Sequence, residues 1–160
     1  MRFQNLHKQM DQMEIEMEKF TRSMIVENQE RNSDVRGSIL SIVDESVMNV
    51  SLITSLAGSI RSNHYHHEDF HYMYVLSGEI DYFFKMPEEK NINYIKVKKD
   101  QTIFTPAGEW HATFFSIETK LIVSSKNPRD QETYENDTVR DVIVNQSNVH
   151  ELMRQLSNEA

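Results

Sequence analysis

Hydrophobic and polar residues follow two different periods along this chain of 160 residues. In the first segment, apolar residues recur at alternating spacings of three and four, which is the pattern of an amphipathic helix. These positions are Phe3, Leu6, Met10, Met13, Met17, Phe20 and Met24. The pattern predicts an N-terminal helix over residues 1–24, whose apolar stripe packs either on its own domain or on a partner subunit.

From residue 25 onward the spacing is that of strands. Short runs rich in Val, Ile, Tyr, Phe and Thr are separated by turn signals such as Ser77–Gly78. The predicted strands are 38–43, 47–56, 60–66, 71–76, 79–84, 93–97, 102–105, 111–117, 120–124 and 139–144. No helical pattern interrupts them, so we predict an all-β barrel or sandwich over residues 25–145. Apolar residues at helical spacing then predict a short helix and tail over residues 146–160.

Composition and charge narrow the class of protein. Lys and Arg number 17 against 25 Asp and Glu, which gives a formal net charge of −8. An acidic chain is a poor ligand for nucleic acid or for an anionic membrane surface. Cysteine is absent, which excludes disulfides, thiolate metal sites and a cysteine nucleophile. Because the chain has neither a membrane-span pattern nor the apolar core of a secretory signal, we expect a cytoplasmic protein.

Five of the seven histidines lie between positions 64 and 111. In a strand His64 and His66 point to the same face, whereas His67 points to the opposite side. His71 follows after a short connection and His111 begins a later strand, so both can converge with the first pair on a barrel interior. Imidazoles from several strands suit a divalent transition metal such as Zn, Fe, Mn, Ni or Cu.

Two alternatives stay open for this cluster. If the connection before His71 folds inward, Glu68 or Asp69 supplies a carboxylate ligand in place of His71. The rings can also be interior histidines that have hydrogen-bond partners and bind no metal. Strand parity predicts the lining of an adjoining small-molecule pocket. Its residues are Ile60, Ser62, Met73, Val75, Thr113 and Phe115. Arg61, just ahead of the histidine pair, is expected at the mouth of the barrel, in reach of a phosphate or carboxylate or in solvent.

The spacing of these residues resembles two motifs of the cupin superfamily, which includes small single-domain metal-binding jelly rolls. The first motif matches Gly58, His64, His66, His71 and Gly78, and the second matches Asp100, Pro106, Gly108 and His111. The resemblance implies a double-stranded β-helix from about residue 35 to 144, with His64, His66, His71 and His111 as metal ligands. The sequence departs from the family at His71, where the commoner cupin has Glu, and so implies a shell of four neutral imidazoles.

A second resemblance concerns the substrate. The run from Asp34 to Gly37, with Arg36 inside it, is similar to the first strand of cupins that isomerise or epimerise nucleotide-linked sugars. It implies a metal-dependent isomerase or epimerase acting on a small polar substrate in activated-sugar or polysaccharide metabolism, and it names no catalytic base. The alternatives are a cupin dioxygenase using Fe or another redox metal, and a non-catalytic ligand-binding cupin. Open sheet edges and the N-terminal apolar stripe predict a homodimer.

Overall fold

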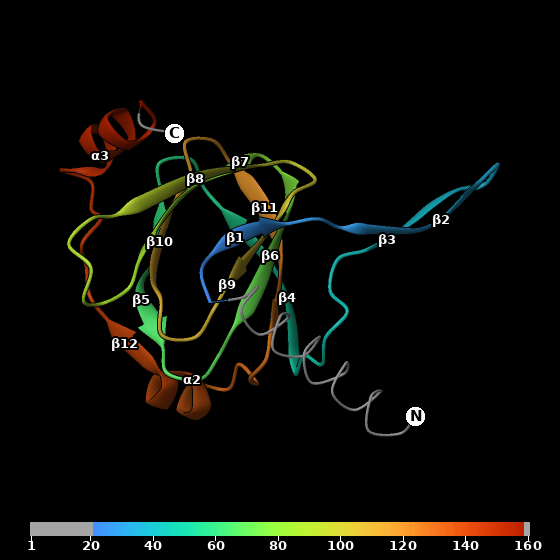
Figure 1. Ribbon diagram of the computed structural model, residues 1–160, viewed down its shortest axis with the longest axis horizontal. Helices are drawn as coiled ribbons and strands as arrows, with labels where there is room; N and C mark the ends of the chain where they lie inside the picture. The colour runs from blue at the N-terminus through green and yellow to red at the C-terminus, as the bar shows by residue number, and fades with distance from the viewer. Residues whose placement is uncertain (1–20, 159–160) are drawn as a thin grey trace, which may run out of the picture.

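The computed structural model describes residues 21–158 (Figure 1). The predicted N-terminal helix therefore lies almost entirely outside the described residues. Its last predicted position is not helical, because Met24 begins strand β1 (Met24–Val26) and pairs with Phe104. No helix in the described part of the chain is long and apolar enough to cross a membrane.

Two five-stranded antiparallel sheets form the body of the molecule and enclose a barrel (Figure 1). The first has the strand order β1-β9-β6-β11-β4 and the second β12-β5-β10-β7-β8. Their bounds are β4 (Asn49–Ser55), β5 (Ile60–His66), β6 (His71–Ser77), β7 (Glu79–Lys85), β8 (Asn93–Lys98), β9 (Thr102–Thr105), β10 (Trp110–Phe114), β11 (Thr119–Ser125) and β12 (Thr138–Arg140). This jelly roll confirms the predicted all-β class, and every predicted strand has a counterpart.

A third, two-stranded sheet stands apart from the barrel. Strands β2 (Gln29–Asp34) and β3 (Gly37–Ser41) pair with each other and with neither large sheet. Figure 1 shows this hairpin extending away from the barrel. Strand β2 is polar throughout, so it lacks the alternation of apolar residues from which strands are predicted.

The expectation that no helix interrupts the strands is wrong at α2 (Gln131–Asp137), which lies between β11 and β12. The helix begins after Asp130, whose carboxylate accepts the Thr133 backbone N–H at 2.9 Å. Tyr134 is its one large apolar residue, so its seven residues contain no helical period to detect. The predicted closing helix is confirmed as α3 (Val149–Leu156).

Apolar residues form two clusters on opposite faces of the second sheet. The cluster between the sheets comprises Met73, Val75, Ile80, Tyr82, Phe84, Val97, Ile103, Phe115, Leu121 and Val123. The cluster on the outer face comprises Phe83, Trp110, Ala112, Phe114, Val144 and Val149. Helix α3 and the segment before it cover that outer face, so the chain itself encloses one side of the barrel.

A distortion in β5 explains how the segment before α3 is held. Ser62 and Asn63 have φ angles of 66° and 58°, in the left-handed region. The Asn63 amide donates to the Val144 carbonyl at 2.8 Å, and its oxygen accepts the Val144 N–H at 3.0 Å. These bonds replace strand pairing, so the strand predicted over 139–144 pairs only as β12. Because the distortion breaks strand parity, Ile60 packs in the outer cluster, and its predicted place in the pocket is wrong.

Gly78 occupies the tight turn between β6 and β7. At its φ of +84°, an added Cβ would lie 2.3 Å from Thr119 Oγ1 and 2.7 Å from the Glu118 carbonyl oxygen. Gly58 has a similar φ of +80°, but an added Cβ there would meet nothing within 4 Å. Gly78 therefore carries both a conformational and a steric constraint.

We predict that Gly78→Ala lowers the free energy of unfolding by about 2–5 kcal/mol, because strain and overpacking add. Gly58→Ala is the matched control and should cost only about 1–2 kcal/mol, from strain alone. Chemical denaturation of both variants measures the difference. Equal losses in the two variants would contradict this account of the turn.

Candidate functional site

Four of the five clustered histidines meet inside the barrel. His64 and His66 lie on β5, His71 begins β6, and His111 lies on β10 opposite His64. The ring centroid of His64 lies 4.7 Å from those of both His66 and His111. His71 lies 5.0 Å from His111 and 5.7 Å from His66. The structure thus brings together the four residues singled out from the sequence, and His67 is exposed as expected.

Three ring nitrogens in this cluster are buried without a hydrogen-bond partner. They are Nε2 of His66, Nδ1 of His71 and Nε2 of His111. The other nitrogen is held in two of these rings. His66 Nδ1 lies 3.4 Å from Asp137 Oδ2, and His111 Nδ1 lies 3.3 Å from the Glu109 carbonyl oxygen. An outer nitrogen held by an oxygen while the inner one stays free is the arrangement of metal-binding histidines.

The imidazoles are neutral at physiological pH. Burial lowers the pKa of His64 to about 3 and that of His66 to about 4. Burial, reinforced by the neighbouring rings, lowers the pKa of His71 and His111 well below the ordinary value. A neutral ring keeps a lone pair, which is what a metal ion or a proton requires.

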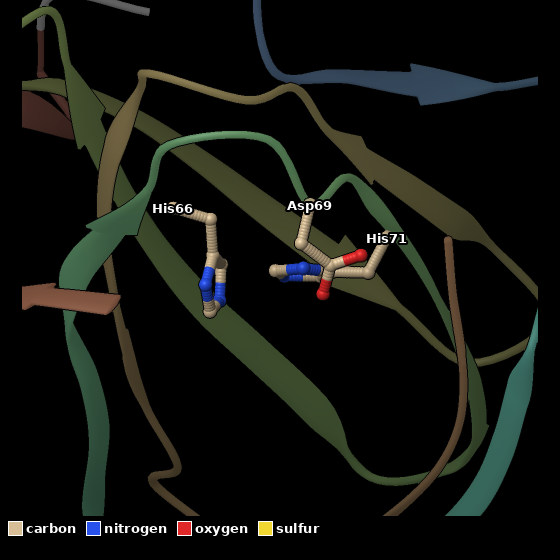
Figure 2. Close-up of side chains that lie close together, drawn as sticks. All are labelled: His66, Asp69 and His71. Carbon is tan, nitrogen blue, oxygen red and sulfur yellow. The ribbon is translucent and has the colours of Figure 1, made fainter. Parts of the chain in front are cut away.

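Asp69 lies next to His71 (Figure 2). His66, Asp69 and His71 each offer one ligand atom, and these atoms lie within 4.8 Å of one another. Asp69 Oδ1 also accepts the Asn127 backbone N–H at 2.9 Å, and burial raises the pKa of this carboxyl group. The connection between β5 and β6 therefore turns Asp69 inward and leaves Glu68 exposed. The sequence left open that Asp69 replaces His71 as a ligand; in the structure the Asp69 carboxylate lies beside the His71 ring, and both residues face the cluster.

The histidines border a cavity of about 160 Å³. The predicted pocket residues that line it are Arg61, Ser62, Met73, Thr113 and Phe115, with His64, His71 and His111. Val75 is fully buried in the core between the sheets and is not part of the lining. The lining residues that were not predicted are Ile53, Leu121, Val123, Arg129 and Tyr134.

Two guanidinium groups reach this cavity without a carboxylate partner among the described residues. Arg129 donates from Nε and Nη2 to Ser125 Oγ at 3.2 and 2.9 Å, and its guanidinium lies 5.1 Å from the Tyr134 ring centroid. Arg61 donates from Nε to Ser55 Oγ at 2.9 Å. Guanidinium groups that are positioned but not paired favour an anionic ligand, with phosphate and carboxylate as their best partners.

Helix α2 packs against the same end of the cavity. The Tyr134 ring centroid lies 6.1 Å from that of His64 and 5.6 Å from that of His66, edge-on to both. Asp137, at the end of the helix, accepts the Asp69 backbone N–H at 3.0 Å. The helix thereby holds both the His66 ring and the loop that presents Asp69. The sequence did not predict Arg129 and Tyr134 as cavity residues, because neither lies in a motif or in a periodic pattern.

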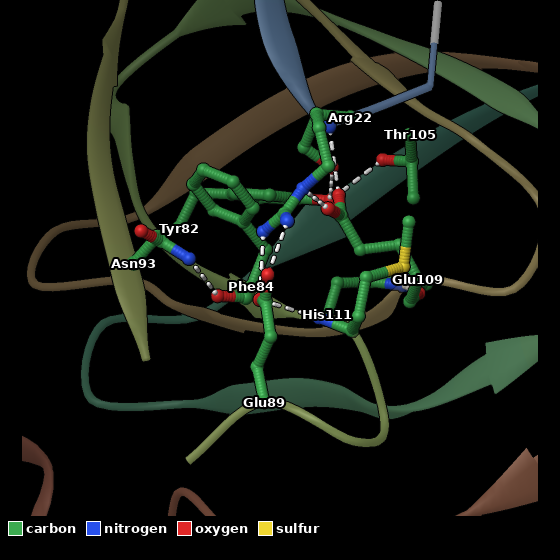
Figure 3. Close-up of polar contacts among 10 residues, drawn as sticks. Arg22, Tyr82, Phe84, Glu89, Asn93, Thr105, Glu109 and His111 are labelled. Carbon is green, nitrogen blue, oxygen red and sulfur yellow. Dashed lines mark hydrogen bonds and ion pairs between the residues drawn. The ribbon is translucent and has the colours of Figure 1, made fainter. Parts of the chain in front are cut away.

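A second polar network joins the N-terminal segment to the cluster (Figure 3). The Glu109 carboxylate is fully buried, accepts the Ser23 backbone N–H at 2.7 Å, and lies 2.5 Å from Arg22 Nε. Ser23 Oγ lies 2.8 Å from the Tyr82 hydroxyl oxygen, and the Tyr82 ring stacks on His111 with an interplanar angle of 10°. Residues just before β1 are therefore part of the support of His111.

The run from Asp34 to Gly37 lies away from the cavity of its own chain. It forms the turn of the β2–β3 hairpin, where the Arg36 side chain is 82% exposed and pairs with the Asp34 carboxylate at 2.6 Å. Arg36 does not line the cavity. The run from Asp34 to Gly37, which resembles the first strand of sugar-nucleotide cupins, therefore contributes no residue to this cavity.

Solved structures share the architecture. The 3,4-ketoisomerase QdtA from Thermoanaerobacterium thermosaccharolyticum, a mutant in complex with TDP-4-keto-6-deoxyglucose, is 15% identical with a TM-score of 0.61, over 85% of this chain and 97% of that one. A 3,4-ketoisomerase from Helicobacter canadensis is 17% identical with a TM-score of 0.62, over 84% and 97%. The capsular polysaccharide assembling protein CapF from Staphylococcus aureus is 23% identical with a TM-score of 0.54, over 72% of this chain and 34% of CapF.

These likenesses show that the chain shares the jelly-roll fold of these structures, as the sequence motifs implied. The sequence itself matches no model of a protein family and none of the curated proteins.

We predict that Arg22→Met lowers the free energy of unfolding by about 3–5 kcal/mol, because it leaves the buried Glu109 carboxylate without its cation. Glu89 binds the same guanidinium at 2.6 Å but is partly exposed, so Glu89→Gln is the matched control and should cost less than about 1 kcal/mol. Thermal and urea denaturation measure both effects. A loss in Glu89→Gln as large as that in Arg22→Met would attribute the effect to the Arg22–Glu89 pair and contradict the role given to Glu109.

Proposed function

We propose that the chain is an isomerase or epimerase that acts on a keto-sugar linked to a nucleotide. One observation carries the proposal: neutral imidazoles and two unpaired guanidinium groups line the same cavity. Imidazoles can take and return a proton beside a sugar carbonyl, and guanidinium groups can bind the diphosphate of an activated sugar. The fold shared with sugar 3,4-ketoisomerases, one of which is in complex with a TDP-linked keto-sugar, supports this choice of substrate class.

In ketoisomerisation a proton leaves the hydroxyl-bearing carbon next to the carbonyl and is returned to the former carbonyl carbon, while the hydroxyl proton moves to the former carbonyl oxygen. One base can take and return the carbon-bound proton. We assign this role to His64, which lines the cavity beside Arg61, Arg129 and Tyr134. Burial alone makes His64 a weak base. An anionic substrate beside the ring favours its protonated form and so opposes the effect of burial.

The guanidinium groups of Arg61 and Arg129 would orient the substrate. Both are held through hydrogen bonds to serine hydroxyls, so little side-chain freedom is lost when an anion binds. The apolar side chains of Met73, Phe115 and Leu121 line the same cavity and would limit the access of water to a bound sugar. Exclusion of water strengthens each electrostatic contact made to the reacting sugar.

We further propose that the cluster holds a divalent transition metal, with Zn, Fe, Mn, Ni and Cu as candidates. The donor set predicted from the sequence was His64, His66, His71 and His111. The unpartnered nitrogens favour His66, His71 and His111 as ligands, with Asp69 as the adjacent carboxylate, and we assign His64 to proton transfer. A bound metal of this kind polarises a carbonyl and stabilises the negative charge that develops on its oxygen.

The two other functions considered from the sequence make different demands. A dioxygenase requires a redox metal and consumes oxygen, and a non-catalytic cupin binds its ligand without turnover. The two guanidinium groups suit a bound anion in either an enzyme or a binding module, so turnover distinguishes the isomerase from the non-catalytic cupin. The cytoplasmic location stays a prediction from the sequence.

We predict that the purified chain converts TDP-4-keto-6-deoxyglucose to an isomer and, in heavy water, incorporates deuterium next to the carbonyl, as followed by proton NMR. His64→Asn should lower kcat by roughly 10²- to 10⁴-fold with little change in KM. Arg129→Gln should instead raise KM by roughly 10- to 100-fold, because a charged hydrogen bond to the diphosphate is lost. Arg154→Gln is the control, since Arg154 pairs with Glu151 on α3 and does not line the cavity. Absence of turnover and of deuterium exchange with nucleotide-linked keto-sugars would overturn the isomerase proposal.

We predict that His71→Ala loses bound metal while its far-ultraviolet circular dichroism stays that of the wild type, because a ligand is removed and the core is unchanged. His71→Glu should retain the metal with altered activity, because a carboxylate replaces the imidazole. His64→Ala should retain it as well if His64 is not a ligand. Elemental analysis by mass spectrometry of protein purified without added metal measures all three. If metal-free wild-type protein keeps full activity in the presence of a chelator, the metal proposal is wrong and the isomerase proposal is unaffected.

A further inference from the structure

The end of helix α2 holds the connection between β5 and β6 through one residue. The two oxygens of the Asp137 carboxylate accept the backbone N–H groups of Glu68 and Asp69, at 2.8 and 3.0 Å. The Asp137 carbonyl oxygen accepts the His67 backbone N–H at 2.9 Å. Three successive amides of the connection are therefore bound to Asp137, and the same connection carries the Asp69 carboxylate to the histidine cluster.

Two oxygen atoms from the same segment lie at the outer nitrogen of His66. Asp137 Oδ2 lies 3.4 Å from His66 Nδ1, and Thr138 Oγ1 lies 3.3 Å from it. The Thr138 hydroxyl donates its one hydrogen to the Tyr134 carbonyl oxygen at 2.6 Å, so it can only accept from His66. A carboxylate also only accepts. The hydrogen of the neutral His66 ring therefore lies on Nδ1, and the lone pair lies on the buried, unpartnered Nε2.

We propose that Asp137 is a positioning residue of the cluster, which with Thr138 fixes the Nδ1–H tautomer of His66 and which also places the Asp69 carboxylate. This role rests on the metal site proposed above, since that site takes its donors from His66 Nε2 and from Asp69. A carboxylate behind a metal-binding imidazole fixes the ring orientation and raises the basicity of the ring. Here one carboxylate acts on two donors at once, because it holds both the ring and the loop.

The tautomer of His66 can be measured in the metal-free protein by long-range nitrogen–proton correlation NMR. We expect the ring hydrogen on Nδ1 in the wild type. In Asp137→Asn an amide group puts a donor among the N–H groups that the carboxylate accepts, so part of the His66 population should change to the Nε2–H form. Glu132→Gln is the matched control, because Glu132 is an exposed acidic residue of the same helix and does not line the cavity. An Nε2–H ring in the wild type would overturn the proposal.

The affinity for Zn²⁺, measured by competition with a chromophoric chelator, supplies the second readout. Asp137→Asn should raise the Kd for Zn²⁺ roughly 10- to 100-fold, and Glu132→Gln should leave it unchanged. Thr138→Val should also raise the Kd, whereas Thr138→Ser, which keeps the hydroxyl, should bind as the wild type does. If Asp137→Asn loses the circular dichroism of the wild type, the comparison of Thr138→Val with Thr138→Ser decides.

Two results separate this role from the metal site itself. If the wild type binds no Zn²⁺ or other divalent transition metal, the metal site is wrong and the role of Asp137 falls with it. If the wild type binds Zn²⁺ and folded Asp137→Asn binds it equally well, the role of Asp137 is wrong and the metal site is unaffected.

Discussion

Burial of four neutral imidazoles at one end of an apolar barrel is the constraint on which the rest of the site depends. A polar nitrogen without a partner in such surroundings costs free energy, and this cluster holds three of them. The arrangement persists because the surrounding structure holds the rings from outside. Asp137 lies against the outer nitrogen of His66, the Glu109 carbonyl oxygen lies against that of His111, and the Tyr82 ring stacks on His111. These unpartnered nitrogens therefore lower the stability of the free protein, and a ligand that binds them would offset that cost.

The groups that hold the histidines come from segments outside the central strands. Asp137 belongs to a helix that follows the last long strand, and the network around Glu109 depends on Arg22 and Ser23, just before the first strand. Strand pairing alone places His64 opposite His111. Orientation of the rings, by contrast, requires both the segment just before β1 and helix α2 to be docked on the barrel.

Much of this architecture could be predicted from the sequence, because alternating apolar residues and turn signals are local information. The four histidines could be predicted as a group because the motif spacing of His64 to His111 reflects strand parity. Arg129 and Tyr134 could not, since α2 is short and polar and reaches the cavity only through tertiary packing. The pocket assignment failed at Ile60 because two successive residues in the left-handed region shift strand parity, and no local pattern announces that shift. The position of Asp69 beside His71 likewise depends on Asn127 and Asp137, which are far away in sequence.

The order of strands in the sheets also has a consequence for how the molecule forms. Asn49 pairs with Ser125, Met24 with Phe104, and Thr138 with His66, so each pairing must close a long loop before it gains any stabilising contact. Topologies dominated by such non-local pairings fold slowly, on the millisecond-to-second scale. The β2–β3 hairpin is the opposite case, since its two strands are joined by a tight turn and can pair within about 1–10 μs. During synthesis and refolding, these two strands can therefore pair long before the barrel closes, although the finished barrel leaves them unpacked.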